Sequence, residues 1–362
     1  MTYKSFRIGL QPEWLLQQKT SAISLSEVLS LLAAIDATGN ITGACKACNL
    51  SYRHAWGTLR RFEALFGVPL LLTRRRQGTA LTPFASRLLW ANRRIEARLM
   101  PTLESLASEL QEELERLLPR NDQPLRLHAS HGFAVEALMQ HMEGRSPGME
   151  LRYRTASEAL ASLERHECDL AGFQIPLGRF EPDILAHYLD WIRPKQHCLI
   201  HLAVRDAGLF VEAGNPKKIR GVADLARNDV RFVNRQIGSS TRRLTGLMLA
   251  EQGIGEHQVQ GYDTNEFTHM AIAAHIASGM ADVGIGVETA ARRFGLDFIP
   301  LVKERYFFAL DRRNLDNPSM QALLQIMQSR EYRSYIGQLA GYDSSLTGDV
   351  QQFEDAFPGT NA

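Results

Sequence analysis

The stretch FVNRQIGSSTRRLT, residues 232–245, decides how the larger part of this chain is interpreted. A short apolar strand runs into Gly238, which permits a tight turn, and Ser239 can cap the helix that follows. The first turn of a helix presents free N–H groups with partial positive charge, and Arg242 and Arg243 add full charge. This order predicts a seat for an anion, although a capped helix start with two solvated arginines is the plainer interpretation of the same residues.

On both sides of this stretch, short apolar runs alternate with helical ones from residue 125 onward. This alternation predicts an α/β domain with a largely parallel sheet. The expected strands are 125–129, 150–154, 170–175, 198–204, 209–211 and 281–287, and the expected helices are 133–142, 157–165, 219–226 and 270–278.

Length and charge indicate more than one domain. The chain has 362 residues, whereas single domains typically have about 100 to 200. Its net charge is only +1, yet residues 51–98 contain ten Lys or Arg against Glu63 and Glu96. Such asymmetry favours a nucleic-acid-binding segment near the N-terminal end.

Composition sets the expected compartment. Hydrophobic residues make up 44% of the chain, and no apolar run approaches the roughly 20 residues of a membrane span. Four cysteines are too few for a disulfide framework. We therefore expect a soluble cytoplasmic protein without membrane contact.

The basic segment has the pattern of a helix-turn-helix. Apolar residues follow helical spacing from residue 23 to 35, Gly39 ends that run, and a short helix is expected at 42–48. Ser51 can cap a third helix, which Gly67 stops. Two short strands around an arginine-rich tip follow and resemble a wing, so residues 1–82 are interpreted as a winged helix-turn-helix head.

The polar faces of the third helix and of the wing are the expected contacts to double-stranded DNA, through base edges and phosphates. The candidate residues are Ser51, Tyr52, Arg53, His54, Thr58, Arg61, Arg74, Arg75 and Arg76.

The sequence offers no convincing metal or cofactor site. Cys45 and Cys48 have the spacing of a redox pair or half a zinc site, but no second Cys/His pair follows and small residues surround them. His269 and His275 lie six residues apart, which does not place them on one helical face. All four are interpreted as structural.

A long helical pattern follows the head. Ile95, Leu99, Leu103, Leu106, Leu110, Leu114 and Leu117 recur at steps of three and four. This seam is typical of a dimerising helix, here placed at 83–119, although a helix packed on its own domain would show the same pattern. Pro101 predicts a kink or a break, and residues 119–124 a hinge. Residues 124–340 are assigned to the α/β domain and 341–362 to a polar, frayed tail.

Two stretches carry a family resemblance. NITGACKACNLSYRHAW, residues 40–56, resembles the winged helix-turn-helix of molybdate-dependent regulators, and FEALFGVPL (62–70) with LTP (81–83) is similar to LysR-type regulators. GMADVGIG (279–286) resembles the type 2 periplasmic-binding-protein fold. FVNRQIGSSTR, GYD (261–263) and THMAIAA (268–274) resemble the version of that fold joined to molybdate-type heads or found in molybdopterin-biosynthesis proteins. The resemblance implies two lobes joined by two crossovers, with a ligand in the cleft between them.

The resemblance also implies effector-binding residues. The family pattern Gly-Ser-His-Asp matches Ala129-Ser130-His131-Gly132 only in its middle, and Gly-Ser-Gly-Thr-Arg becomes Gly-Ser-Ser-Thr-Arg, with Ser240 in place of the second glycine. The candidates are Ser130, His131, Gln174, Ser239, Ser240, Thr241, Arg242 and Thr268. His131 could equally cap its helix, and Gln174 could satisfy loop backbone groups.

These features favour a DNA-binding transcriptional regulator, a homodimer or homotetramer, whose promoter binding responds to a small anionic effector. The resemblance implies molybdate, tungstate, a molybdenum-cofactor-related compound or a small carboxylate such as formate, and control of molybdoenzyme-related genes. One alternative is an enzyme or carrier in molybdenum cofactor biosynthesis, but no Walker loop, nucleophile elbow or catalytic carboxylate pair supports an enzyme. Another alternative is a constitutive DNA-binding protein with a vestigial cleft.

Overall fold

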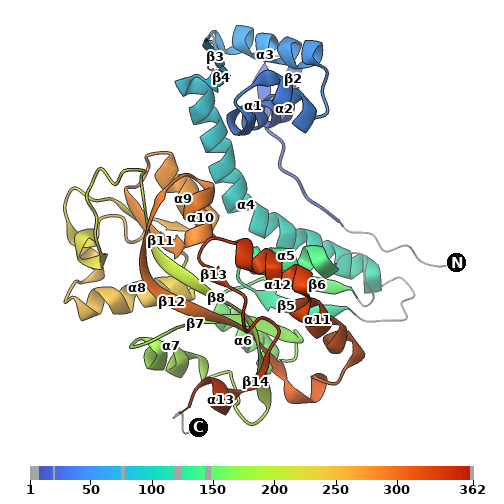
Figure 1. Cartoon of the computed structure of the whole chain (residues 1–362), viewed down its shortest axis with the longest axis vertical. Helices are drawn as coiled ribbons and strands as arrows, with labels where there is room; N and C mark the ends of the chain where they lie inside the picture. The colour runs from blue at the N-terminus through green and yellow to red at the C-terminus, as the bar shows by residue number, and fades with distance from the viewer. Residues whose placement is uncertain (1–7, 19–20, 75–77, 117–123, 143–147, 359–362) are drawn as a thin grey trace, which may run out of the picture. The chain divides into compact units, whose positions relative to one another are not determined.

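The computed structural model describes residues 8–18, 21–74, 78–116, 124–142 and 148–358 (Figure 1). The chain forms two compact units: Gln11–Ala97 makes up one, and the described residues before Gln11 join those from Arg98 onward in the other, so that one boundary lies within the long helix α4 (Pro83–Arg116). The predicted domain boundaries at residues 82, 119 and 124 stay predictions.

The first unit is a helix-turn-helix with a wing, as predicted. The sequence indicates a short strand or arm within residues 1–21, and in the structure a hairpin of β1 and β2 precedes the three helices. Its elements are β1 (Leu15–Gln18), β2 (Ser21–Ser24), α1 (Ser26–Thr38), α2 (Ile41–Ala47), α3 (Tyr52–Phe66), β3 (Leu71–Arg74) and β4 (Gly78–Leu81), followed by the start of α4.

Local signals set the helix boundaries in this unit. The Asn40 side chain accepts from the Gly43 N–H at 2.6 Å, and the Ser51 hydroxyl from the His54 N–H at 3.2 Å. Gly39 and Gly67 end α1 and α3 with φ of 68° and 69°, a conformation that costs glycine little. The helices then bury their apolar faces in one core.

The second unit has two lobes. Lobe I contains β5 (Leu125–Ala129), α5 (Phe133–Met142), β6 (Met149–Tyr153), α6 (Ala156–Glu164), β7 (Leu170–Pro176), α7 (Glu181–Tyr188), η3 (Arg312–Asn314), α11 (Pro318–Gln328) and α12 (Arg330–Gln338). Lobe II, yellow to orange in Figure 1, contains η1 (Val222–Ala226), β9 (Phe232–Arg235), α8 (Ser240–Glu251), η2 (Glu256–Gln258), β10 (Asn265–Glu266), α9 (His269–Ala277), β11 (Val283–Val287) and α10 (Glu288–Arg293).

Two long strands, β8 (His197–Val211) and β12 (Asp297–Asp311), run antiparallel through both lobes. β8 pairs with β11 in lobe II, and β12 pairs with β7 in lobe I. These strands are the two crossovers that the resemblance implied, and β8 replaces the two separate strands expected at 198–204 and 209–211.

The sheet is mixed rather than largely parallel. Its path is β10-β9-β11-β8-β12-β7-β5-β6. Pairing is parallel at the two ends, among β9, β10 and β11 and among β5, β6 and β7. It is antiparallel wherever β8 or β12 takes part, because each crossover returns directly beside the other.

The C-terminal segment corrects the expectation of a frayed tail at 341–362. Residues 342–357 include β13 (Tyr342–Asp343) and β14 (Val350–Gln352), both paired with β8, and α13 (Phe353–Ala356). Phe353 and Phe357 are 1% and 2% exposed in the core of α6, α7 and β7. Burial of two aromatic rings stabilises this segment despite its polar composition.

Helix α4 runs through Pro101 as one helix, so of the two expected outcomes the break is wrong and the kink stays a prediction. Its leucine seam is exposed within the described residues: Leu99, Leu106, Leu110 and Leu114 are 41–48% exposed. Leu117 and residues 119–123 of the expected hinge lie outside the described residues. Of the helices in the described ranges, none has the length and apolar character needed to cross a membrane.

Candidate functional site

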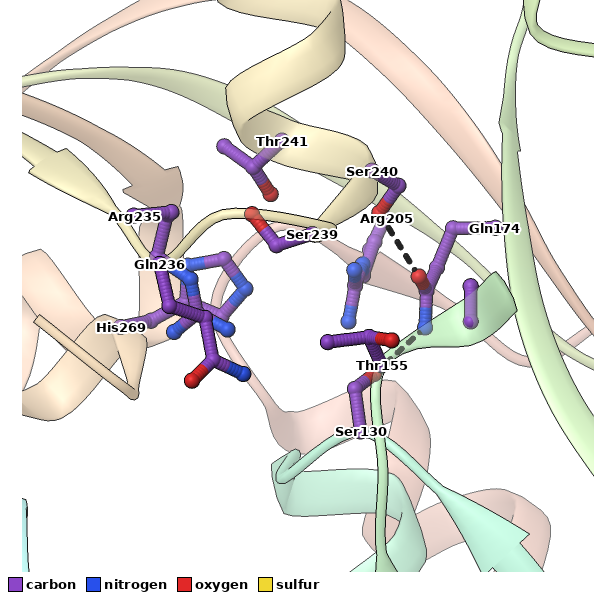
Figure 2. A pocket seen from close by; sticks show the side chains of 11 residues that line it. Ser130, Thr155, Gln174, Arg205, Arg235, Gln236, Ser239, Ser240, Thr241 and His269 are labelled. Atoms are coloured by element: carbon purple, nitrogen blue, oxygen red, sulfur yellow. Dashed lines mark hydrogen bonds between the residues drawn. The ribbon is translucent and has the colours of Figure 1, made fainter. Parts of the chain in front are cut away.

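A pocket lies between the lobes, with lining residues from both lobes and from β8 (Figure 2). The empty space among the lining residues is about 290 Å³, a figure that includes open solvent at the mouth of the pocket. The lining residues are Ser130, Thr155, Ala156, Gln174, Arg205, Arg235, Gln236, Ser239, Ser240, Thr241 and His269. Of these described residues, none is acidic, so the pocket suits an anion.

Three helices begin at this pocket. Thr155 caps α6 from lobe I, and Ser239 caps α8 and Thr268 caps α9 from lobe II, each accepting from the N–H three residues on. The first two helical N–H groups of each helix have no partner within that helix. Each N-terminus therefore adds partial positive charge beside the pocket.

A chain of hydrogen bonds connects the lobes across the pocket. The Ser240 hydroxyl donates to Gln174 Oε1 at 2.9 Å, and Gln174 Nε2 donates to Ser130 Oγ at 2.7 Å. The dashed lines in Figure 2 follow this chain. The serine that replaces the family's glycine thus provides a contact between the lobes.

Arg205 is a charged group at the junction of the lobes. It lies opposite Glu304 in the β8–β12 ladder, and its Nε and Nη2 donate to Glu304 Oε2 at 3.1 and 3.0 Å. Both side chains are 2% exposed. Burial opposes the charge of Arg205, but Glu304, together with Tyr342 and Tyr306, raises its pKa, so this arginine stays ionised and is neutralised by Glu304.

Arg235 has no such partner. It ends β9 and is 3% exposed, and its Nε and Nη1 lack a hydrogen-bond partner among the described residues. Burial, followed by the charge of Arg205, lowers the pKa of Arg235 to about 9. Near neutral pH the guanidinium is still charged, and a buried unpaired cation is costly unless a ligand neutralises it.

His269 is neutral. Burial, followed by Arg235 and Arg205, lowers its pKa well below the ordinary value of 6.5. Its Nδ1 has no hydrogen-bond partner in the described part of the chain. The imidazole can therefore donate or accept a hydrogen bond without adding charge.

Five of the eight predicted effector residues line the pocket, namely Ser130, Gln174, Ser239, Ser240 and Thr241. His131 instead contacts Glu136 of α5 at 2.8 Å. Arg242 lies over the Tyr262 ring at 4.8 Å and reaches Asp263, and Thr268 is a fully buried helix cap. These three border the pocket without lining it, so their predicted role in binding the effector stays a prediction.

The missed residues are Thr155, Ala156, Arg205, Arg235, Gln236 and His269. Arg235 and Gln236 stand at the end of an apolar strand before the glycine, which is a sequence signal for a side chain at the strand's carboxyl edge. His269 follows a helix cap and could have been found in the same way. Arg205 carries no local signal.

The predicted DNA-contacting face of α3 is largely exposed. Ser51, Tyr52, Arg53, His54 and Arg61 are all exposed. His54 Nε2 lies 3.0 Å from Glu27 Oε2 of α1.

Thr58 is the exception on this helix. It is 8% exposed and its hydroxyl donates to Glu27 Oε1, so it supports the helix from below rather than facing outward. In the wing, Arg74 ends β3, whereas Arg75 and Arg76 lie outside the described residues.

Cys45 is buried in the core of the first unit, and Cys48 Sγ lies 3.7 Å from the Ser30 carbonyl oxygen. His275 Nδ1 is 3.0 Å from Glu266 Oε1, also in a buried setting. Within the described ranges, no three His, Cys, Asp or Glu side chains gather so as to hold a metal ion.

Comparisons with known proteins place both units. The model of the PBP superfamily domain matches residues 136–328, more than half of the chain. The chain belongs to the PBP superfamily. Residues 26–86 match the bacterial regulatory helix-turn-helix protein model of the lysR family. This PBP-superfamily chain is thus a LysR-type transcriptional regulator with a PBP-like effector-binding domain, and its family is not one of enzymes.

Individual relatives vary in their coverage. The uncharacterized protein YvgK of Bacillus subtilis (strain 168) is 31% identical over 248 residues, which cover 67% of this chain and 79% of the relative. The molybdenum-pterin-binding protein MopB of Rhodobacter capsulatus is 27% identical over 181 residues, 44% of this chain and 67% of the relative. The structure of an OxyR mutant from Corynebacterium glutamicum with bound hydrogen peroxide is 14% identical and has a TM-score of 0.41, covering 82% of this chain and 89% of that one.

Proposed function

We propose that a small anion bound between the lobes controls how this regulator binds its promoter DNA. The observation that carries the proposal is Arg235, a buried cation that lines the pocket and whose Nε and Nη1 lack a hydrogen-bond partner among the described residues. A bound anion would neutralise it, and ligand contacts from both lobes would favour one arrangement of the lobes over others.

The effector and genes we propose are related to molybdenum. MopB, a molybdenum-pterin-binding protein by name, shares 27% identity over 181 residues. This similarity supports molybdate, tungstate, a molybdenum-cofactor-related compound or a small carboxylate such as formate as the effector. The target genes would then be those of molybdoenzymes, and the regulator would bind their promoters in the cytoplasm.

The proposed DNA contacts are the exposed α3 residues Ser51, Tyr52, Arg53, His54 and Arg61, together with the wing arginines. Two copies would pair through the exposed leucines of α4, as a homodimer or as part of a homotetramer. Two-fold pairing predicts operator half-sites one or more helical turns apart.

The test starts by selecting the operator from random DNA with the purified full chain. Operator affinity is then titrated at constant ionic strength, because salt alone weakens DNA binding. We expect at least one of molybdate, tungstate or formate to change the affinity. Unchanged affinity across the panel would instead support a DNA-binding protein with a vestigial cleft.

A further inference from the structure

We propose that the occupant of the pocket is a compact, fully deprotonated tetrahedral dianion, of the class that includes molybdate, tungstate and sulfate. This inference rests on the proposed function and narrows its effector, since planar monocarboxylates and pterin compounds are excluded. Three observations support it: the positive charge at the pocket, the directions from which its hydrogen-bond donors approach, and the lack, among the described lining residues, of a carboxylate to accept a proton from the ion.

The charge at the pocket matches a dianion. Arg205 is neutralised by Glu304, which leaves Arg235 as the unpaired full positive charge among the described lining residues. The N-termini of α6, α8 and α9 each add roughly half a charge. A monoanion such as formate would leave much of this positive potential uncompensated.

The donors approach from different elements and from both lobes. The N-terminus of α6 comes from lobe I, those of α8 and α9 come from lobe II, and Arg235 ends the neighbouring strand β9 (Figure 2). A tetrahedral ion has acceptor oxygens in all directions, whereas a planar carboxylate concentrates its acceptors on one side. The empty space of about 290 Å³ includes open solvent, so the room between the lining side chains is small, which also favours a compact ion over a pterin.

Proton accounting separates this class from phosphate. Near neutral pH inorganic phosphate carries at least one proton and must donate it. No carboxylate is present among the described lining residues to accept that proton, and Gln174 Oε1 already accepts from Ser240, so the remaining acceptors are neutral groups such as His269 Nδ1 and the Gln236 amide oxygen. Molybdate, tungstate and sulfate carry no proton under these conditions and need only donors.

The experiment measures binding of each ion to the full-length protein by calorimetry and thermal shift, at about pH 8 and constant ionic strength. The probes are molybdate, tungstate, sulfate, formate and inorganic phosphate. We expect at least one of the first three to bind at least about tenfold more tightly than formate and phosphate, which corresponds to about 1.4 kcal/mol. Equal or tighter binding of formate or phosphate, or no binding of any tetrahedral dianion, would overturn the inference.

Two arginine variants locate the site. Arg235→Met removes the charge with little loss of volume, and it should abolish dianion binding. Arg242→Met removes an arginine that borders the pocket without lining it, and it should retain binding. Retained binding in Arg235→Met, or its loss only in Arg242→Met, would refute the assigned site.

The melting temperature of the unliganded variant distinguishes a binding role from a structural one. Removal of a buried cation whose Nε and Nη1 lack hydrogen-bond partners among the described residues should leave that temperature unchanged or raise it, whereas loss of a structural contact would lower it. The proposed function is tested separately. A dianion that binds through Arg235 but leaves operator affinity unchanged would support the proposed class of ligand and refute control of DNA binding by that ligand.

Discussion

Buried histidines of this protein make its stability depend on pH. His201 in β8 is 1% exposed, both of its ring nitrogens lack partners among the described residues, and it lies against Phe307. Burial, followed by the charge of Arg305, lowers its pKa to about 4. The folded state therefore resists a proton that the unfolded chain accepts below about pH 6.5.

We expect His201→Leu to reduce acid sensitivity. In the wild type, the free energy of unfolding falls as pH drops from about 6.5 to 4, because the unfolded state binds more protons, and this group accounts for about 3 kcal/mol. The variant lacks that loss, which urea unfolding at several pH values would reveal. His257→Leu, at an exposed position, serves as the control and should keep the wild-type pH slope.

Ser240 is the second residue with a measurable consequence. Ser240→Ala removes the hydrogen bond to Gln174 but keeps the helix start, because the cap is Ser239. We expect the effector to bind about 5-fold more weakly, since one net hydrogen bond contributes about 1 kcal/mol. If calorimetry gave the same effector affinity for the variant and the wild type, the hydrogen bond between Ser240 and Gln174 would not contribute to effector binding.

At the scale of elements, helix α3 carries the predicted DNA-contacting residues on its exposed face. Arg53→Ala should weaken operator binding by about 1–3 kcal/mol while effector binding stays intact. Arg220→Ala, an exposed position in the other unit, makes the same charge change and should have no effect on operator affinity. Equal affinity of the Arg53 variant and the wild type in a DNA-binding assay would remove Arg53 from the DNA-contacting face.

Helix α4 determines the expected assembly. Leu106→Glu places a charge in the exposed leucine seam, so we expect the oligomer to dissociate in sedimentation experiments. Leu177→Glu is the matched control, because Leu177 is 37% exposed and lies outside the seam. A Leu106 variant that sediments like the wild type would contradict pairing through this face.

Elements with local signals could be predicted from the sequence. Ser51 and Ser239 cap helices where the pattern placed caps, because a cap is formed by neighbours three residues apart. Thr58 is buried instead of lying on the outer face of its helix, because helical spacing does not show that Glu27, on another helix, lies beneath it. The frayed tail was wrong because Phe353 and Phe357 find their aromatic neighbours only in the folded chain.

At the scale of the whole molecule, the pocket depends on pairings between distant segments. Arg205 meets Glu304 across 99 residues, so neither sequence neighbourhood indicates a buried ion pair. The lobes and their crossovers were predictable by resemblance, and the Ser130 and Ser239–Thr241 segments with them. Arg235 was visible in the deciding stretch, but its lack of a partner is a property of the fold.

Linkage gives the prediction for the full regulator. If an anion changes operator affinity by some factor, the operator must change anion affinity by the same factor, typically about 5- to 150-fold. Calorimetric titration of the anion with and without operator DNA measures this directly. Unequal factors would mean that the two effects do not arise from one equilibrium.

The antiparallel crossovers also make lobe II an insertion with adjacent ends. Val211 at the end of β8 lies opposite Asp297 at the start of β12, so the chain leaves and re-enters the pair of strands at one place. A tight turn from Val211 to Asp297 would join the two strands as a simple hairpin. Lobe II is therefore an insertion that begins and ends at neighbouring positions of these two strands. Related regulators could exchange this lobe, and with it half of their ligand preference, while the DNA-binding head and lobe I stay the same.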